Sequence, residues 1–163
     1  MENPANFLLR RSERSDLPQL LLLLAPLRST AFNWSEKSFR GEFEYSQTWV
    51  YQEVGQQVGQ VADELAKIKA LICLRDATDA WEISIVATAV QFQKKGVMEA
   101  MMKALMERLG GERHLWLEVH EDNVIAQKLY QKLGFETNHR RGGYYSDGSA
   151  AIVMSLPARI LKP

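Results

Sequence analysis

The chain has a single cysteine, Cys73, so it cannot form an internal disulfide. Its 20 basic residues balance 20 acidic ones, which leaves no net charge to favour binding of nucleic acid through a broad basic face. The apolar run LPQLLLLLAPL is too short to cross a bilayer, which takes about 20 residues, and no small-residue cleavage site follows it. We therefore expect a soluble, cytoplasmic protein whose partners include neither nucleic acid nor a membrane.

The chain also lacks internal repeats and low-complexity tracts. Its 163 residues are most simply one domain spanning 1–163, acting as a monomer or weak dimer. A chain of this length can bury roughly two thirds of its unfolded surface, so its fold needs neither a disulfide nor a metal. Cys73 lies in the apolar run ALICL, and we expect it to be an inert thiol in the core.

Periodicity and turn residues predict a mixed α/β domain. Helices are expected after a cap at Ser15 or Asp16, closing at Pro26, and after an N-cap at Ser35. The segment 54–66 reads as a long hairpin connection or one extra helical turn. Strands are expected at 7–10, 48–54, 67–74, 81–88, 113–119 and 150–156, and further helices at 97–109 and 124–133.

The stretch LEVHEDNVIAQKLYQKLGF, residues 117–135, combines a strand and a helix. Leu117 and Val119 alternate with polar residues, and Asp122 or Asn123 can cap the helix that follows. The apolar stripe of that helix is expected at Ile125, Leu129 and Leu133, with Tyr130 beside it and Gly134 as the left-handed residue that ends it.

The segment QFQKKGVM lies between a strand and the long helix. The first amides of a helix have no internal partner and attract anions, and Gly96 would allow a phosphate to approach the backbone. An ordinary solvated loop is the alternative, because neither a Walker loop nor a GxGxxG motif is present. The apolar face of the long helix is expected at Met98, Met101, Met102, Leu105 and Leu109.

QKKGVM at a helix start, followed by LWLEV and N..A..LY.KLGF, resembles the GCN5-related N-acetyltransferase (GNAT) family, which binds acetyl-CoA through a Q/R-x-x-G-x-G/A loop. With NWSEKSF and RRGGYYSDGSAAIVMSL, the chain is most similar to the RimI-type ribosomal-protein N-terminal alanine acetyltransferases, from Trp34 to Leu156. The resemblance implies an α/β (mixed α+β) fold, with a central mixed, twisted sheet of about six to seven strands and about four helices. It also implies acetyl-CoA as cosubstrate, no metal, and a peptide or protein N-terminus, such as that of a ribosomal protein, as acceptor.

The resemblance assigns roles to individual residues. Glu118 matches the family's general base and Tyr130 its general acid. In the family, the asparagine at the start of the next helix contacts the cofactor, as does the strand before the phosphate loop. Cofactor contacts are therefore expected from Val86, Ala87, Thr88, Gln93, Lys94, Lys95, Gly96, Val97, Met98, Glu99 and Asn123. The family has Gly or Ala where this chain has Met98, whose side chain we expect in the core.

Each assignment has a structural alternative. Glu118 could be a solvent-facing strand residue, Tyr130 an aromatic at the edge of the core, and Asn123 a helix cap only. His120 is a rival base, although its position suggests the surface or the rim of the substrate site. The function could instead be acetylation of a small amine, a lysine or a polyamine, or binding of acyl-CoA or a protein without turnover.

Overall fold

The computed structural model of the chain describes residues 7–29, 34–54 and 68–158. The expected connection at 54–66 therefore lies outside the described residues, apart from Val54. No helix within the described ranges is long and apolar enough to span a bilayer.

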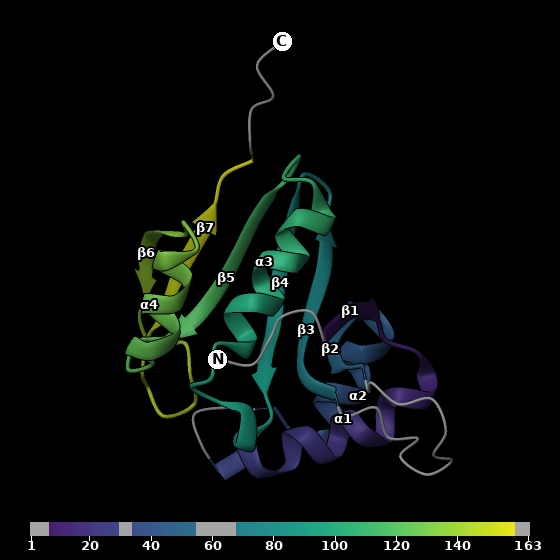
Figure 1. Cartoon of the computed structure of the whole chain (residues 1–163). Coiled ribbons are helices and arrows are strands. Elements are labelled where there is room, and N and C mark those ends of the chain that lie inside the picture. Colours follow the sequence, from purple (N-terminus) through teal and green to yellow (C-terminus); the bar gives the residue numbers. More distant parts are fainter. Residues whose placement is uncertain (1–6, 30–33, 55–67, 159–163) are drawn as a thin grey trace, which may run out of the picture. The chain divides into compact units, whose positions relative to one another are not determined.

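Seven strands form one mixed sheet in the order β1-β2-β3-β4-β5-β7-β6. The described residues also form four α-helices, the number that the sequence predicted. Figure 1 shows the course of these elements along the chain. The strands are β1 (Phe7–Arg11), β2 (Gln47–Glu53), β3 (Ile68–Ala77), β4 (Ala80–Thr88), β5 (His114–His120), β6 (Glu136–Arg141) and β7 (Ala151–Leu156). The helices are α1 (Leu17–Leu24), α2 (Glu36–Tyr45), α3 (Val97–Leu109) and α4 (Val124–Lys132), with short 3-10 turns at Arg14–Asp16 (η2), Ala25–Ser29 (η3) and Val90–Phe92 (η4).

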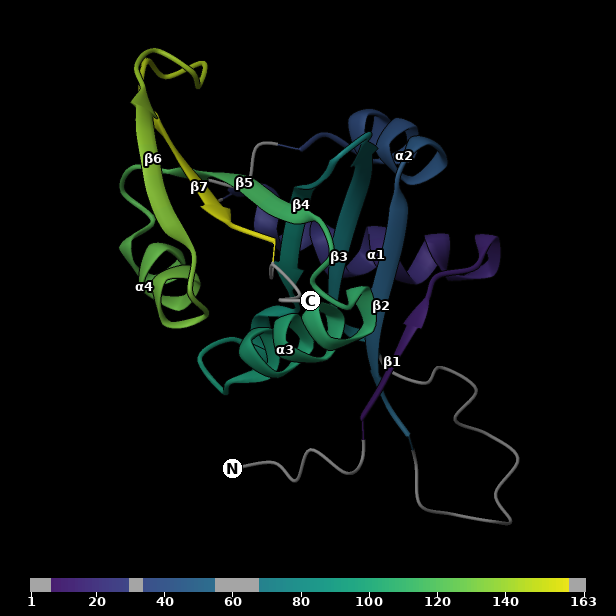
Figure 2. The same cartoon turned by 90° about the horizontal axis from the view of Figure 1, so that it is seen from above.

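The chain divides into two compact units, the first made of residues 1–73 and 85–105. Leu20 and Leu24 of α1 and Phe39 of α2 pack with Val50 of β2 and Leu71 of β3 in one buried core. The ribbons of these helices and strands can be followed in Figure 2. Full burial of one such side chain contributes about 1.5–3 kcal/mol. Cys73 belongs to this core and is fully buried, as expected.

Local signals set the helix starts in this first unit. The Ser35 side chain accepts a hydrogen bond from the Ser38 amide at 3.0 Å, which confirms the predicted N-cap of α2. Before α1, the Asp16 carboxylate accepts from the Glu13 amide and from the Arg10 guanidinium. The hydrogen bond from Arg10 holds the pKa of Asp16 below its usual value.

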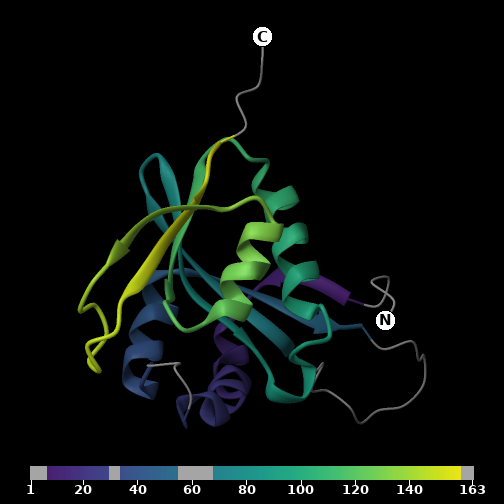
Figure 3. The ribbon, with the colours of Figure 1, turned by 90° about the vertical axis from the view of Figure 1, so that its left-hand side faces the viewer.

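The second unit comprises residues 74–84 and 106–163. Here β5 pairs antiparallel with β7, from Leu115 opposite Leu156 to His120 opposite Ala151. Beyond β7, β6 forms the edge of the sheet, and α4 lies beside this hairpin (Figure 3). Gly134 follows α4 at φ +95°, which confirms the left-handed residue expected at the end of that helix.

The edge strand β6 is an addition to the expected elements. All six of its residues, ETNHRR, are exposed, so it has no apolar alternation that a sequence pattern could detect. Hydrogen bonds to β7 define the strand, with a register shift between Thr137 and His139. The strand matters because it delivers Arg140 and Arg141 to the end of the sheet where β5 stops.

Candidate functional site

One candidate region, in the first compact unit, is the loop of residues 93–98, which enters α3. The turn η4 precedes it and is closed by a hydrogen bond from the Phe92 amide to the Ala89 carbonyl. Lys94 has φ +58° and Gly96 φ +78°, and Gly96 accepts the first helical bond from the Ala100 amide. Left-handed residues alternating with right-handed ones turn successive amides toward one side, and such a backbone nest binds anions. A helix N-terminus adds partial positive charge, so this loop can hold a phosphate.

The loop is tied to the last residues of β4. The Gln93 side-chain amide donates to the Thr88 carbonyl at 3.2 Å. Ala87 is buried, whereas Val86 and Thr88 are half-buried on the opposite face of the strand. The ladder between β4 and β5 pairs Ala80–Ile83 with His114–Leu117, so the described residues 84–88 lie outside it. The backbone of 86–88 on that edge therefore remains available to a substrate.

The start of α3 corrects the predicted apolar face. The buried residues are Val97, Met101, Met102 and Leu105, whereas Met98 is only half-buried. Met101, Met102 and Leu105 are thus buried as predicted, whereas Val97 is buried in place of Met98 because it lies in one i, i+4, i+8 row with residues 101 and 105. Glu99 in the first turn forms an ion pair with Lys103 at 2.8 Å.

A second candidate region, in the second compact unit, surrounds Glu118 on β5. Its carboxylate accepts from the Arg141 guanidinium at 2.8 Å, and only 15% of its side chain is exposed. A hydrogen bond with Glu118, together with burial, raises the pKa of Tyr144 to about 12. The Arg141 guanidinium also lies over the Tyr144 ring, 4.8 Å from its centroid. Glu118 is therefore an enclosed, ion-paired carboxylate and not a free solvent-facing residue.

Tyr130 lies on the next helix and is the buried residue of α4, with 5% of its surface exposed. Its ring packs against Phe135 at 5.8 Å. Burial raises the pKa of its hydroxyl, and Tyr145 adds to the rise. Tyr145 itself has a raised pKa through burial and the charge of Glu118. Tyr145 is therefore within electrostatic range of both Glu118 and Tyr130.

The buried face of α4 also differs from the prediction. Ile125, expected on the apolar stripe, is 70% exposed, whereas Tyr130 and Leu133 are buried. A helix has 3.6 residues per turn, so residues spaced by four do not stay on one face. Of the row 125–129–133, Ile125 therefore lies outside the buried face of α4. The face that packs runs through Ala126, Leu129, Tyr130 and Leu133.

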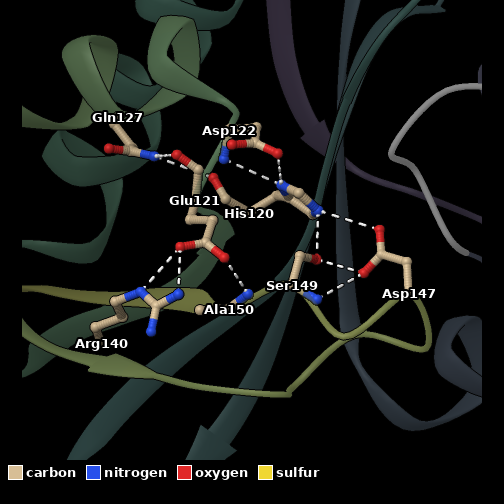
Figure 4. A network of polar contacts seen from close by, with 8 residues as sticks. All are labelled: His120, Glu121, Asp122, Gln127, Arg140, Asp147, Ser149 and Ala150. Atoms are coloured by element: carbon tan, nitrogen blue, oxygen red, sulfur yellow. Dashed lines mark hydrogen bonds and ion pairs between the residues drawn. The ribbon is translucent and has the colours of Figure 1, made fainter.

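His120, at the end of β5, is not a surface residue, since its side chain is only 12% exposed (Figure 4). Its Nδ1 accepts a hydrogen bond from the Asp122 amide at 3.1 Å. The neutral ring must therefore carry its proton on Nε2, which lies 2.7 Å from Ser149 Oγ. Ser149 in turn donates to the Asp147 carboxylate. Both ring nitrogens are therefore engaged in hydrogen bonds, Nδ1 with the Asp122 amide and Nε2 with the Ser149 hydroxyl. The lone pair of Nδ1 is occupied, so the neutral ring cannot take a proton from an amine without losing that bond.

Glu121, the residue after His120, also holds the segment that links β6 to β7. Its carboxylate accepts from the Ala150 amide at 2.6 Å and from the Arg140 guanidinium at 2.7 Å (Figure 4). The bond from the Ala150 amide, followed by that from Arg140, holds the pKa of Glu121 below its usual value. The loop of residues 142–150 between β6 and β7 is thus anchored to the end of β5, which positions Tyr144 and Tyr145 beside Glu118.

Comparison with known proteins identifies the family of this chain. A sequence model of the acetyltransferase (GNAT) family matches residues 20–135. The chain is also 30% identical over 150 residues to the ribosomal protein bS18-alanine N-acetyltransferase of Escherichia coli K12, covering 89% of this chain and 93% of the relative. The chain belongs to the GNAT family. It is an N-acetyltransferase.

Solved GNAT structures show the same fold. The crystal structure of the Escherichia coli ribosomal-protein-S18-alanine N-acetyltransferase superimposes with a TM-score of 0.76 at 28% identity and covers 96% of both chains. A GNAT acetyltransferase from Elizabethkingia anophelis with acetyl-CoA bound has a TM-score of 0.70 at 15% identity, covering 93% of this chain and 98% of that one. Acetyltransferases of this fold use acetyl-CoA.

Three residues around Glu118 were not among the residues that the GNAT motif singled out. Arg141, Tyr144 and Tyr145 all come from RRGGYYSDG, whose two adjacent tyrosines beside a glycine pair were a visible signal. Their contact with Glu118 was not visible, because it depends on the register of β6 and β7 against β5.

Asn123 is a helix cap in the structure. Its Oδ1 accepts from the Ala126 amide at 3.1 Å, which leaves its amide nitrogen as a hydrogen-bond donor. Replacing Asn123 by alanine should lower the free energy of unfolding by about 1 kcal/mol, measured by urea denaturation, because the Ala126 amide loses its partner. Serine keeps a capping oxygen, so Asn123→Ser should regain most of that stability.

The same pair of variants tests whether Asn123 also contacts the cofactor. If its amide nitrogen binds CoA, both variants should lose CoA affinity by calorimetry, although only the alanine variant is destabilised. Equal CoA affinity in the wild type and the serine variant would leave Asn123 with the capping role alone.

Proposed function

We propose that this GNAT protein transfers the acetyl group of acetyl-CoA to the N-terminal α-amine of a protein, with Glu118 as base and Tyr130 as acid. The observation that carries the proposal is the enclosed cluster of Glu118, Tyr144, Tyr145 and Tyr130 at the end of β5. The similarity to ribosomal-protein N-terminal acetyltransferases over 89% of the chain supports the choice of acceptor.

The 93–98 loop fits the pyrophosphate of acetyl-CoA. Lys94 and Gly96 have the left-handed conformations of an anion-binding nest, and a Cβ added at Gly96 would meet no atom within 4 Å. Lys94 and Lys95 supply positive charge, and Met98 retains its amide. Acetyl-CoA supplies the acetyl group as an activated thioester. The backbone of Val86–Thr88, which lies outside the β4–β5 ladder, would donate to the carbonyl oxygen where negative charge develops.

Glu118 would remove the proton that the amine nitrogen must lose before or during its attack. An ionised carboxylate has two oxygens and about four lone-pair sites, so the bond from Arg141 leaves acceptor capacity for an incoming ammonium group. The neutral nitrogen would then form its bond to the acetyl carbon as the bond from that carbon to sulfur breaks, and the second proton that the nitrogen loses would replace, through water, the one that Tyr130 gives to the sulfur. The proton taken from the amine leaves through Glu118, directly or through water.

Tyr130 would supply the proton that the departing sulfur needs. Burial raises the pKa of its hydroxyl, so the group is protonated throughout the physiological range. A protonated hydroxyl is a hydrogen-bond donor, and it stabilises the sulfur as negative charge develops there.

An α-amine suits this machinery better than a lysine. The pKa of an α-amine is about 7.7–8.0, against about 10.4 for lysine, so its proton is easier to remove by roughly 2.5 units, or about 3.4 kcal/mol. A peptide with an N-terminal alanine and an internal lysine should therefore be acetylated at the α-amine, about two orders of magnitude faster than at the side chain. Mass spectrometry of the fragmented peptide would locate the acetyl group.

Thiol release from acetyl-CoA provides the matching control. The same peptide with a blocked N-terminus should release almost no thiol, whereas a peptide with its lysine replaced by arginine should react at the full rate. Acetate found only on the lysine side chain would contradict the proposed acceptor and leave the GNAT assignment in place.

A further inference from the structure

Lys69, in β3, is an unusual residue for the interior of a sheet. Only 2% of its side chain is exposed, and lysine is almost never fully buried without a compensating partner. Its ammonium forms an ion pair with Glu53 in β2 at 3.0 Å. None of the roles assigned above uses this buried cation.

The ammonium lies between two aromatic rings that come from distant parts of the chain. Its Nζ is 4.1 Å from the centroid of the Phe92 ring in η4 and 4.7 Å from that of the Phe7 ring in β1. A desolvated cation over an aromatic face is held electrostatically by the ring quadrupole. The charge is therefore compensated by a carboxylate and two rings, and it fixes the position of both rings.

The same residue also holds the root of η4 through its backbone. The Lys69 carbonyl accepts a hydrogen bond from the Ala89 amide at 2.9 Å. Ala89 begins the turn that Phe92 ends, so the two contacts of Lys69 fix both ends of η4. Gln93, the first residue of the 93–98 loop, follows directly.

We infer that Lys69 is a positioning residue, which clamps Phe92 and so holds the 93–98 loop in the conformation that receives the pyrophosphate of acetyl-CoA. The role rests on the proposed cofactor site, but it is a property of the free protein. Fixing a loop before its ligand arrives lowers the entropy lost on binding, so the clamp acts on cofactor affinity and not on the chemical step.

Lys69→Met keeps an unbranched side chain and removes the cation. It should raise the KM for acetyl-CoA and the Kd for CoA by about fivefold to thirtyfold, the range of a buried cation–π contact. The kcat at saturating acetyl-CoA and the KM for the acceptor should stay within about twofold of wild type. Phe92→Leu should give a comparable loss of affinity, and the double variant should lose clearly less than the sum of the two single losses, because both variants remove the contact between Lys69 and Phe92.

Arg113→Met is the matched control. The Arg113 guanidinium forms an ion pair with Asp76 at 2.6 Å and lies 4.2 Å from the Trp81 ring, so this variant also loses an ion pair and a cation–π contact. Within the described residues, Arg113 contacts Asp76, Ala80 and Trp81 and neither η4 nor the 93–98 loop, so the KM for acetyl-CoA should not change. Equal changes of kcat and both KM values in the Lys69 and Arg113 variants would show a general loss of stability and overturn the inference.

Hydrogen exchange of the CoA-free protein separates this inference from the proposed cofactor site. The amides of residues 92–97 should exchange faster in Lys69→Met than in wild type, with the core of β3 unchanged. Wild-type exchange rates together with a wild-type Kd for CoA would overturn the role of Lys69. A wild type that binds no CoA would remove the cofactor site, while the exchange data would still decide whether Lys69 holds the loop. If Lys69→Met does not fold, Phe92→Leu decides, and a wild-type Kd in that variant would refute the clamp.

Discussion

Replacing Tyr130 by phenylalanine should lower kcat by a factor of about 10²–10⁴, the usual contribution of a general acid. The phenyl ring keeps the buried position and the contact with Phe135, so the fold should be retained. Only the hydroxyl is lost, and with it the proton for the leaving sulfur. The Kd for CoA, measured by calorimetry, should change little because the 93–98 loop is untouched.

Tyr51 provides the matched control for this substitution. It is buried to the same 5% exposure, and burial raises the pKa of its hydroxyl too, but it lies in β2. Tyr51→Phe should therefore turn over acetyl-CoA at the wild-type rate. If Tyr130→Phe also did so, Tyr130 would be an aromatic residue of the core edge and not the acid.

A valine at position 96 should abolish the rise in melting temperature that CoA causes in the wild type. At a CoA concentration of about 100 times the Kd, binding to the folded state contributes about 2.7 kcal/mol, or a rise of about 5–10 °C for a chain of this size. Gly96 has φ +78°, a conformation that costs a residue with a Cβ about 1–2 kcal/mol. Valine would move the backbone out of this conformation and destroy the nest of amides.

Gly110 is the matched control, because it has a left-handed backbone like that of Gly96 but lies after α3, outside the 93–98 loop. Its φ is +73°, and an added Cβ there would also meet no atom within 4 Å. Gly110→Val should thus lose a similar amount of stability by differential scanning fluorimetry and still show the full CoA-dependent rise. A full rise in a folded Gly96→Val variant would remove the 93–98 loop from the proposed cofactor site.

Features that depend on a few neighbouring residues could be predicted from the sequence. The cap at Ser35, the left-handed glycine at 134 and the loop before α3 all appear where the sequence predicted them. These features depend on a few consecutive residues, whose backbone preferences act over one helical turn or less. The GNAT resemblance rests on the same short-range patterns, so the amino-acid sequence alone is enough to reveal it.

Finer details of the helix faces were predicted less well. Met98 and Ile125 were expected in the core, yet the first is half-buried and the second is exposed. Met101, Met102, Leu105 and Leu133 are buried as predicted, and the error lies at the start of each helix, where several apolar residues fit more than one face. Packing against the neighbouring strands decides which of these faces is buried, and the periodicity of apolar residues alone does not predict it.

The sequence by itself determined the order of most elements, their caps and turns, and the residue types of the acetyl-transfer motif. Tertiary structure alone decided the partners of those residues. Arg141 meets Glu118 across 23 residues of chain, through an edge strand whose polar sequence carries no strand pattern. Lys69 reaches Phe92 and Phe7 only because three strands and a turn converge around it. Such contacts depend on strand register and long-range packing, which are set by the whole core and not by any short segment.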